Sequence, residues 1–261
     1  MLKENVRPQP VVISLDGNIG AGKSTLLEEV RKAMPEVEVV VEPVGEWLTL
    51  QDEEGKSLLE LFYGDKRRWA YTFQNLTILS RLKAIRDVLR TTKKSIIIME
   101  RSVLTDRYVF AEMLKDDGLI DDLEYQLYLK WFEQFASELP LKGMIHVTTG
   151  ISLATTRISK RGREGEENIP SDYLAALENQ HSKWLANTEL PVLRVCTDDD
   201  VDPQENISKI RSWITSCGWE SAGSGSSKGE SVVDDDDVAV AKQLLLKTPA
   251  ASSEPAPAVT M

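Results

Sequence analysis

The stretch Gly17-Asn18-Ile19-Gly20-Ala21-Gly22-Lys23-Ser24-Thr25 decides the fold of this chain. It follows the β-branched run at residues 11–15 and opens a helical pattern. Glycines let such a loop curl so that successive N–H groups point into one concavity, and the following helix adds its partial positive charge. Lys23 can then reach the outer phosphates, and Ser24 can ligate Mg²⁺. Because a strand precedes the loop and a helix follows it, the pattern predicts that the chain binds a nucleoside triphosphate.

Composition limits the kind of partner. The chain has 261 residues, of which 41% are hydrophobic, and this is enough for one substantial core. Its formal net charge is −11, and no basic stripe is present that could release counterions, so we expect neither a nucleic acid nor an acidic membrane surface as partner. No apolar run approaches the ~20 residues needed to cross a bilayer. We therefore expect a small substrate.

Cysteine and histidine are scarce. Cys196 and Cys217 make no disulfide framework, and together with His146 and His181 they give no zinc-binding spacing. This usage favours a reducing compartment. Residues 1–10 have no apolar core and resemble neither a signal peptide nor a transit peptide. We expect a cytoplasmic protein, with the nucleus as the open alternative.

Short β-branched runs alternate with helical patterns along the chain. The expected strands are residues 11–15, 37–41, 95–99, 144–148 and 192–195, and the expected helices are residues 57–62, 66–90, 121–139, 152–160, 171–186 and 204–214. Such alternation is typical of a parallel sheet covered on both faces. We therefore predict an α/β fold, a three-layer sandwich of the P-loop type with a five-stranded parallel sheet between helices.

The chain divides into three segments. We expect an N-terminal extension at residues 1–10, one domain at residues 11–219 and a tail at residues 220–261. Gly/Ser clusters, four consecutive aspartates and a Pro/Ala/Ser-rich end predict that the tail is disordered. Residues 238–246 are helix-capable, and they are either a docking segment or part of a solvated tail.

Two expected strands end in charged residues. Glu42 follows the second strand, and Glu100 and Arg101 follow the third. Ligands bind outside the carboxyl ends of strands in open α/β sheets, so these side chains should lie beside the phosphate-binding loop. There Glu42 suits a base that orients a substrate hydroxyl for attack on a γ-phosphoryl group, Glu100 can hold Mg²⁺, and Arg101 can neutralise developing charge. A Glu42 that caps a turn and an ordinary Glu100–Arg101 ion pair are the structural alternatives.

A basic segment follows the fourth strand. Arg157, Lys160, Arg161 and Arg163 place four cations within seven residues. In a phosphotransferase this composition suits a mobile lid that closes over the triphosphate, whereas elsewhere it is typical of a solvated helix end. Glu166 comes next and can accept a hydrogen bond from a sugar hydroxyl.

Further short motifs occur in one order along the chain. They are Glu42-Pro43-Val44 with Trp47, Tyr63, Phe73-Gln74, Leu79-Ser80-Arg81, Glu100-Arg101-Ser102 with Asp106-Arg107-Tyr108, and residues 157–163 followed by Glu166 and Ile169-Pro170. With the phosphate-binding loop, they resemble the deoxyribonucleoside kinase family, in the branch of deoxycytidine, deoxyguanosine and deoxyadenosine kinases. The resemblance covers about residues 11–214 and leaves out the tail.

The resemblance implies a role for each matching residue. Glu42 would be the base at the 5′-hydroxyl, with Arg101 beside it, and Ser24 and Glu100 would surround Mg²⁺. ATP would be the donor, bound by residues 17–25 with Arg157, Arg161, Arg163 and Asp200. The deoxynucleoside pocket would comprise Trp47, Tyr63, Phe73, Gln74, Arg81, Asp106, Phe110 and Glu166, in which Tyr63 and Glu166 hold the 3′-hydroxyl. The resemblance also implies an Arg-rich lid and a homodimer.

Base preference is expected to depend on Gln74, Arg81 and Asp106. An amide offers one donor and one acceptor, so Gln74 can pair with the edge of cytosine or adenine. Family members that prefer thymidine tend to have small or apolar residues at the positions of Arg81 and Asp106, so this charged pair favours deoxycytidine and deoxypurines. A structural salt bridge between two helices is the alternative interpretation.

We therefore expect ATP-dependent phosphorylation of a deoxyribonucleoside at its 5′-hydroxyl, in nucleotide salvage. Two other classes share the phosphate-binding loop. A nucleoside monophosphate kinase of the thymidylate kinase type also has the Asp-Arg-Tyr run and the lid, but its phosphorylated acceptor calls for Arg or Lys where Glu42 stands. A non-catalytic ATP-binding regulator needs neither base nor lid.

Overall fold

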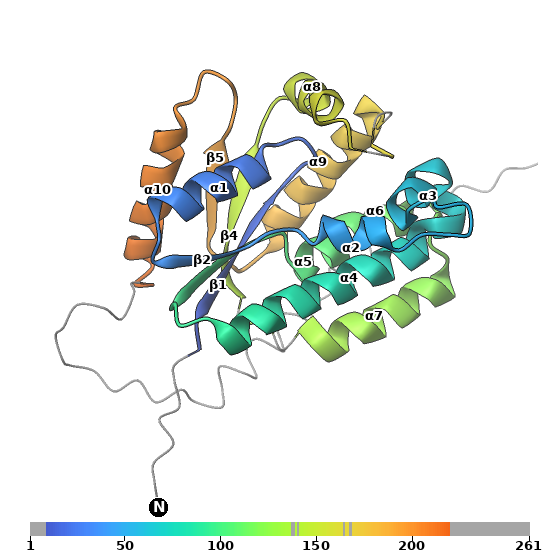
Figure 1. Cartoon of the computed structure of the whole chain (residues 1–261), viewed down its shortest axis with the longest axis horizontal. Helices are drawn as coiled ribbons and strands as arrows, with labels where there is room; N and C mark the ends of the chain where they lie inside the picture. Colours follow the sequence, from blue (N-terminus) through green and yellow to red (C-terminus); the bar gives the residue numbers. More distant parts are fainter. Residues whose placement is uncertain (1–8, 137–138, 140, 164, 167–168, 220–261) are drawn as a thin grey trace, which may run out of the picture.

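A five-stranded, wholly parallel sheet forms the centre of the molecule (Figure 1). The structure is a computed structural model that describes residues 9–136, 139, 141–163, 165–166 and 169–219. The strand order is β2-β3-β1-β4-β5. The strands are β1 (Val11–Gly17), β2 (Val37–Val40), β3 (Ile96–Glu100), β4 (Leu141–Thr148) and β5 (Val192–Cys196). The predicted α/β class with five parallel strands is confirmed.

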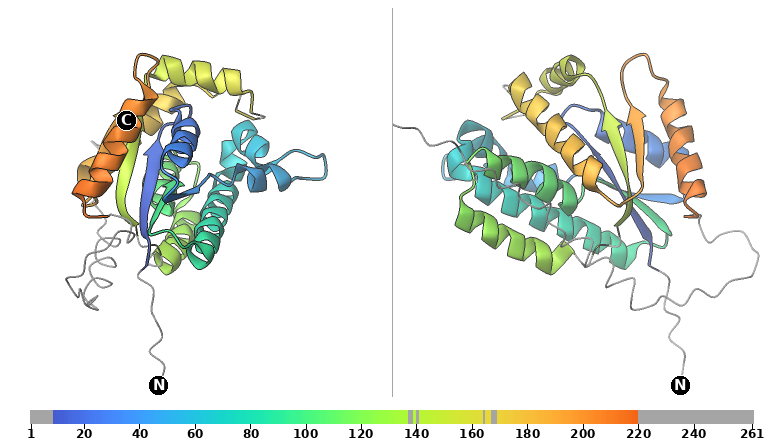
Figure 2. Two further views of the ribbon diagram at one scale, coloured as in Figure 1. Left: turned by 60° about the vertical axis from the view of Figure 1, so that its left-hand side comes forward. Right: turned by 180° about the vertical axis from the view of Figure 1, so that it is seen from behind.

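Helices cover both faces of the sheet (Figure 2). They are α1 (Lys23–Ala33), α2 (Val44–Thr49), α3 (Leu58–Gly64), α4 (Lys66–Thr91), α5 (Val103–Thr105), the π-helix η1 (Asp106–Ala111), α6 (Glu112–Asp116), α7 (Asp122–Ala136), α8 (Ile151–Arg161), α9 (Ser171–Asn187) and α10 (Pro203–Ser216). Helices α1 and α10 share one face, and α4, α5, η1, α7 and α9 lie on the other. Helices α2 and α3 extend the second layer beyond the carboxyl ends of the strands.

The central strand β1 separates two cores. Its residues Ile13 and Leu15 are fully buried against α1 and α10, in a cluster that includes Leu27 and Ile210. Side chains alternate along a strand, so Val12 faces the opposite layer, where it packs with Ile85 of α4. Burial on both faces explains why the strands read as nearly continuous apolar runs in the sequence.

The structure corrects three details of the sequence prediction. Residues 44–49, for which we predicted no element, form α2, and this helix carries Trp47. The fourth strand begins at Leu141 and not at residue 144. The helix expected at residues 121–139 is described as α7 as far as Ala136, and residues 137, 138 and 140 lie outside the described residues. Residues 103–116, for which we predicted no element, form α5, η1 and α6 in succession.

Both ends of the chain lie outside the described residues, namely residues 1–8 and residues 220–261 with the helix-capable residues 238–246. The described part ends at Trp219, whose ring packs edge-on against Trp213 at a centroid distance of 5.2 Å. No helix in the described part is long and apolar enough to cross a membrane.

Candidate active site

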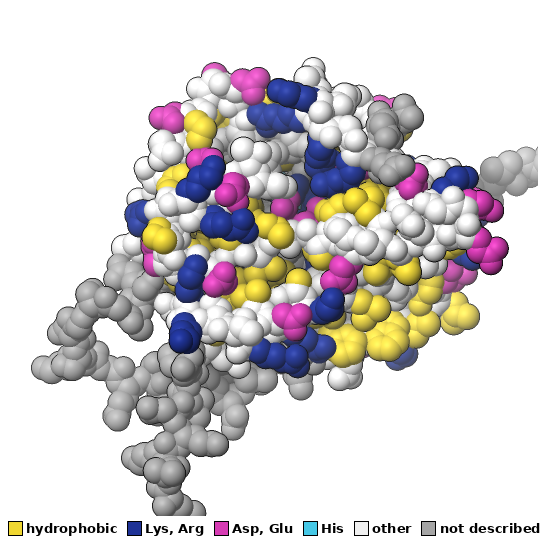
Figure 3. Space-filling model, viewed as in Figure 1, with side chains coloured by type: hydrophobic (Ala, Val, Ile, Leu, Met, Phe, Trp, Pro, Cys, Tyr) yellow, Lys and Arg dark blue, Asp and Glu magenta, His cyan; other side chains and the backbone are white. Residues whose placement is uncertain are grey.

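A cavity of about 930 Å³ opens at the carboxyl ends of the strands. Lys23, Ser24, Glu42 and Glu100 line its centre. One end is lined by residues that follow β5, and the other by aromatic side chains from α2 and α4. Figure 3 shows Lys and Arg side chains gathered around the hollow on this side of the molecule. One continuous cavity therefore joins the phosphate-binding loop to an aromatic slot.

The loop after β1 has the conformation that its glycines permit. Gly17, Gly20 and Gly22 all have positive φ, at 143°, 76° and 81°. A Cβ at Gly17 would lie 2.2 Å from the carbonyl oxygen of Val147, so a side chain there would collide with β4. Glycine is the residue that adopts such angles without cost. The predicted phosphate-binding loop therefore has the backbone that its sequence requires.

Lys23 lies along this loop. Its Nζ donates hydrogen bonds to the carbonyl oxygens of Gly17 (3.0 Å) and Asn18 (2.6 Å). Burial lowers the pKa of Lys23 to about 7, and the nearby Arg101 guanidinium is the second cause of this shift. An anion bound beside Lys23 would stabilise its charged form and raise this pKa.

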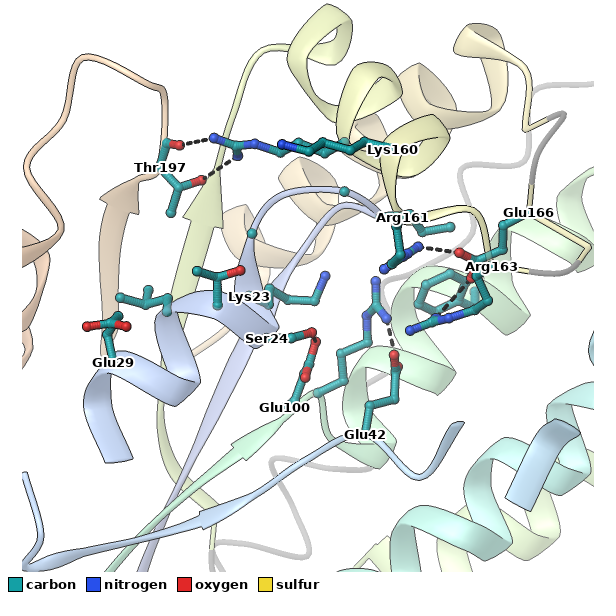
Figure 4. A pocket seen from close by; sticks show the side chains of 18 of the residues that line it. Lys23, Ser24, Glu29, Glu42, Glu100, Lys160, Arg161, Arg163, Glu166 and Thr197 are labelled. Carbon is teal, nitrogen blue, oxygen red and sulfur yellow. Dashed lines mark hydrogen bonds and ion pairs between the residues drawn. The ribbon is translucent and has the colours of Figure 1, made fainter. Parts of the chain in front are cut away.

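Ser24 and Glu100 bring two side-chain oxygens together. The Ser24 hydroxyl donates a 2.9 Å hydrogen bond to Glu100 Oε1, and both side chains line the cavity next to Lys23 (Figure 4). The described residues contain no group of three or more His, Cys, Asp or Glu side chains able to hold a metal ion. Two protein oxygens suit Mg²⁺ that takes its other ligands from phosphates and water.

Glu42 lies between two guanidinium groups. Its Oε1 accepts hydrogen bonds from Arg81 Nη2 (2.6 Å) and Arg101 Nη1 (2.7 Å). All three side chains are at least nine-tenths buried. Burial alone would raise the pKa of Glu42, but the charges of Arg101 and Arg81 outweigh it and hold the pKa well below its usual range. Glu42 is therefore ionised throughout the neutral range.

Arg101 has an unusual backbone conformation. Its φ of 57° is the only positive value among the described residues other than glycine. The conformation is held by hydrogen bonds from Arg101 N to the Leu15 carbonyl (3.0 Å) and from Nη2 to the Gly17 carbonyl (3.2 Å). The guanidinium also lies 5.1 Å from the ring centroid of Phe110. These contacts direct the side chain across the end of β1 towards Glu42.

Arg81 and Asp106 form a buried ion pair. Arg81 Nε lies 3.0 and 3.1 Å from the two carboxylate oxygens of Asp106, and Arg81 Nη1 donates to the Glu100 carbonyl (3.1 Å). This geometry agrees with the interpretation of the pair as a structural salt bridge between two helices. Both side chains also line the cavity, so the interpretation as a base-contacting edge still applies. Burial, only partly offset by Arg81, raises the pKa of Asp106 to about 6.

Aromatic rings surround the far end of the cavity. Trp47 meets Phe73 edge-to-face at 5.5 Å, and Phe73 stacks on Phe62 at 4.6 Å. Trp47 Nε1 donates to the Ser80 hydroxyl (2.9 Å), which fixes the indole in place. Gln74 is buried and lines the cavity, and its Oε1 has no hydrogen-bond partner among the described residues. Trp47 and Phe73 are thus both core residues and cavity walls.

Tyr63 and Glu166 close the rim on one side. Glu166 pairs with Arg161 and with Arg163, the latter at 3.1 Å (Figure 4). Burial, followed by nearby Tyr173 and Glu166, raises the pKa of Tyr63 well above its usual value. Tyr63 and Glu166, far apart in the sequence, therefore lie in one neighbourhood.

The end of the cavity that is lined by residues after β5 holds two residues that the sequence did not predict, Thr197 and Asp199. The Thr197 hydroxyl donates to the Ala21 carbonyl (2.7 Å), and the Thr197 carbonyl accepts from Arg157 Nη2 (2.6 Å). Arg157 also pairs with Asp199 at 3.0 Å. Asp199 lines the cavity, whereas Asp200 is not among its lining residues. A threonine in an acidic turn gives no sequence signal for such a bridge.

The parallel sheet, the loop after β1 and the charged strand ends define a P-loop kinase. The deoxynucleoside kinase family model matches residues 13–216, so the chain belongs to the deoxynucleoside kinase family and is an enzyme of that class. ATP is the usual phosphate donor of this family.

Curated relatives agree with this assignment. The chain is 36% identical over 239 residues to deoxycytidine kinase 2 of Gallus gallus, a match that covers 78% of this chain and 90% of the relative. It is 31% identical over 235 residues to deoxycytidine kinase of Homo sapiens, with the same coverage of 78% and 90%. It is 29% identical over 229 residues to a mitochondrial deoxyguanosine kinase of Xenopus laevis, covering 77% and 86%.

Proposed function

We propose that this enzyme transfers the γ-phosphoryl group of ATP to the 5′-hydroxyl of a deoxyribonucleoside in nucleotide salvage. The observation that carries the proposal is that Glu42 lines one cavity together with Lys23 of the phosphate-binding loop and with Trp47 and Phe73 of the aromatic slot. A nucleoside in the slot would direct its 5′-end towards the loop.

Glu42 is the acceptor for the proton of the 5′-hydroxyl. Both of its hydrogen bonds from arginine end on Oε1, which leaves Oε2 to meet the substrate. Its low pKa makes it a weak base, so it orients the hydroxyl and takes the proton late, as the loose transition state of phosphoryl transfer allows. Arg101, in contact with Glu42, bears the positive charge that stabilises the oxygens of the transferred group.

The phosphates are bound from several sides. Loop N–H groups and Lys23 hold the triphosphate, and Ser24 and Glu100 would hold Mg²⁺, which neutralises phosphate charge when bound. Arg161 and Arg163 belong to the proposed Arg-rich lid. Their pairing with Glu166 keeps the cations at the cavity rim, where they can exchange a carboxylate for a phosphate.

Deoxycytidine and deoxypurines are the proposed acceptors, ahead of thymidine. The unpartnered Gln74 Oε1 and the Arg81–Asp106 pair present a polar edge inside the cavity. Exocyclic amines of cytosine and adenine can donate to this edge, whereas thymine brings a methyl group and an O4 acceptor. Tyr63 and Glu166 are the proposed partners of the 3′-hydroxyl.

One assay tests the proposal against its alternative. ATP consumption is measured with each of the four deoxynucleosides and, separately, with their 5′-monophosphates. We expect turnover with deoxynucleosides only, because a phosphorylated acceptor would place its charge against Glu42 and Asp106. Turnover with monophosphates alone would instead indicate a thymidylate-kinase-like enzyme, and binding of ATP with no turnover would indicate a regulator.

We also propose a homodimer formed through α4 and α7. Leu79, Leu123, Leu127 and Trp131 are exposed on this face, and Leu123 is 76% exposed. Hydrophobic side chains gather over these helices at the lower right of Figure 3. Sedimentation should show a dimer that Leu127→Lys converts to a monomer, whereas Leu50→Lys, at an exposed leucine outside this face, should leave it intact.

The remaining proposals concern boundaries and location. We propose that residues 11–219 form the catalytic domain and that truncation after Ser221 preserves both turnover and the thermal midpoint, which a direct comparison of the two proteins tests. We also propose a cytoplasmic location, since the cysteines Cys196 and Cys217 are free. Cell fractionation tests it.

A further inference from the structure

A buried carboxylate lies directly beneath the phosphate-binding loop. Asp16 is the residue of β1 before Gly17, and it is completely buried. Its Oδ2 has no hydrogen-bond partner among the described residues, and burial raises its pKa. A carboxylate in the centre of a sheet costs stability unless its contacts compensate. We therefore expect Asp16 to have a specific role at this position.

The contact that Asp16 makes leads to a second segment. Its Oδ1 accepts a hydrogen bond from the hydroxyl of Thr105, which is also completely buried. The same Thr105 oxygen accepts a 3.2 Å hydrogen bond from the backbone N–H of Ser102. One hydroxyl thus uses its donor and an acceptor site to connect the strand before the loop with residues 101–106 after β3. These residues, called the 101–106 turn below, include the short helix α5 and the first residue of η1.

That turn carries two residues of the active site. Arg101, with its positive φ, comes immediately before Ser102, and Asp106 comes immediately after Thr105. Residues in such backbone conformations persist only where the surroundings over-determine them. The Thr105 hydroxyl fixes the turn from within, between the arginine that contacts Glu42 and the aspartate that contacts Arg81.

We propose that Asp16 and Thr105 are positioning residues for phosphoryl transfer, which hold the 101–106 turn so that Arg101 meets Glu42 and Asp106 meets Arg81. This inference rests on the proposed function. Neither residue lines the cavity, so both act through the turn and not on the substrate. A purely structural role would affect the thermal midpoint and leave the kinetic constants unchanged.

The test removes the Thr105 hydroxyl and compares the effect with that of the same change at a matched threonine. Thr105→Val preserves volume and removes both hydrogen bonds, and Thr105→Ser retains them. Thr92 provides the control, because its hydroxyl likewise donates to a carboxylate, Glu38 (3.1 Å), and accepts from a backbone N–H, that of Lys94 (3.2 Å), away from the cavity. Turnover, the thermal midpoint, and the dissociation constants of ATP and deoxynucleoside are measured for all variants.

We expect Thr105→Val to lower kcat/KM for the deoxynucleoside about tenfold or more, since both hydrogen bonds of the Thr105 hydroxyl are lost and Asp16 Oδ1 is left buried without a partner. Nucleoside binding by calorimetry should weaken while ATP binding stays within twofold. Thr105→Ser should restore both constants to within threefold. Thr92→Val should lower only the thermal midpoint.

Asp16→Asn provides a second variant if Thr105→Val does not fold. It keeps the volume and an acceptor oxygen for Thr105 but replaces the carboxyl group, so a smaller loss in the same constant is expected. A folded Thr105→Val or Asp16→Asn protein with wild-type kcat/KM and nucleoside affinity overturns the positioning role. An unmodified enzyme that turns over no deoxynucleoside overturns the proposed function instead.

Discussion

Arg101 Nη1 donates a 2.7 Å hydrogen bond to Glu42 Oε1, so the candidate base is paired directly with a buried cation. This contact and the one from Arg81 favour the ionised carboxylate so strongly that protonation has no part in the neutral pH range. Glu42 can therefore accept a hydrogen bond from a hydroxyl throughout the neutral pH range.

The first prediction concerns turnover by a Glu42→Gln variant. The amide cannot take the proton of the 5′-hydroxyl, so kcat should fall by roughly 10²- to 10⁴-fold while ATP affinity is kept. Steady-state kinetics and ATP titration measure both quantities. Glu46→Gln, at an exposed glutamate of α2 paired with Lys83, is the control. A kcat near that of the wild type would refute the role of Glu42.

The second prediction concerns proton uptake by Lys23. With its pKa lowered to about 7, Lys23 is mostly neutral at pH 8, and bound phosphates should restore its charge. ATP binding at pH 8 should therefore take up close to one proton, and binding at pH 6 should take up much less. Calorimetry in buffers of different ionisation enthalpy measures the uptake. Lys160→Met, at an exposed cavity lysine, should leave the uptake unchanged, and no uptake at pH 8 would contradict the prediction.

The third prediction concerns acid stability and the stacked pair His146 and His181, whose ring centroids lie 5.6 Å apart. Burial, then Arg194 and Lys23, lower the pKa of His146 from 6.5 to about 4. As the pH falls, the unfolded chain takes up a proton on this histidine at a higher pH than the folded protein does. The contribution of neutral His146 to the unfolding free energy is therefore complete above pH 6.5 and is lost as the pH falls towards 4.

Replacing His146 should remove part of that loss. From pH 7.5 to 5, His146→Phe should lose about 2 kcal/mol less unfolding free energy than the wild type. Urea denaturation at each pH measures the difference. Parallel pH dependences in the two proteins would contradict the assignment.

The fourth prediction concerns the base. Thymidine should be the poorest of the four deoxynucleosides, because its methyl and O4 would leave the Arg81–Asp106 edge poorly paired at a cost of about 1–3 kcal/mol. Arg81→Met combined with Asp106→Ala should shift the ratio of kcat/KM values towards thymidine. The structure adds that Arg81 also holds Glu42, so the variant should lose kcat with every substrate. Efficient phosphorylation of thymidine by the unmodified enzyme would refute this pocket.

Strands and long helices were predictable because they carry uniform patterns. The start of β4 was missed, since Lys142 and Gly143 are poor strand formers, and only the structure shows why Gly143 is there. A Cβ at Gly143 would lie 2.8 Å from the Trp213 ring and 2.7 Å from that of Trp219. Residues 103–116 were missed for a related reason, because the π-helix Asp106–Ala111 interrupts the 3.6-residue period on which helix prediction depends.

The residues of the candidate site were predictable where they fall in motifs. Glu42, Ser24 and Glu100 come together as the strand ends indicated. The Arg81–Asp106 pair was one of the two interpretations of the sequence, but the second pairing of Arg81 with Glu42 was not foreseen, because a side chain's partners across three elements depend on tertiary packing. Asp16 and Thr105 gave no signal at all, since each looks like an ordinary polar residue until the strand and the turn are brought together.

The position of β1 also has consequences for how the protein is made. β1 is synthesised first but lies in the middle of the sheet, and its neighbours β3 and β4 begin only at Ile96 and Leu141. Until both have left the ribosome, at least one edge of Val11–Gly17 offers unpaired backbone groups, which favours pairing with other chains. Nascent chains that stop before Leu141 are therefore expected to aggregate, and folding must wait for the second half of translation.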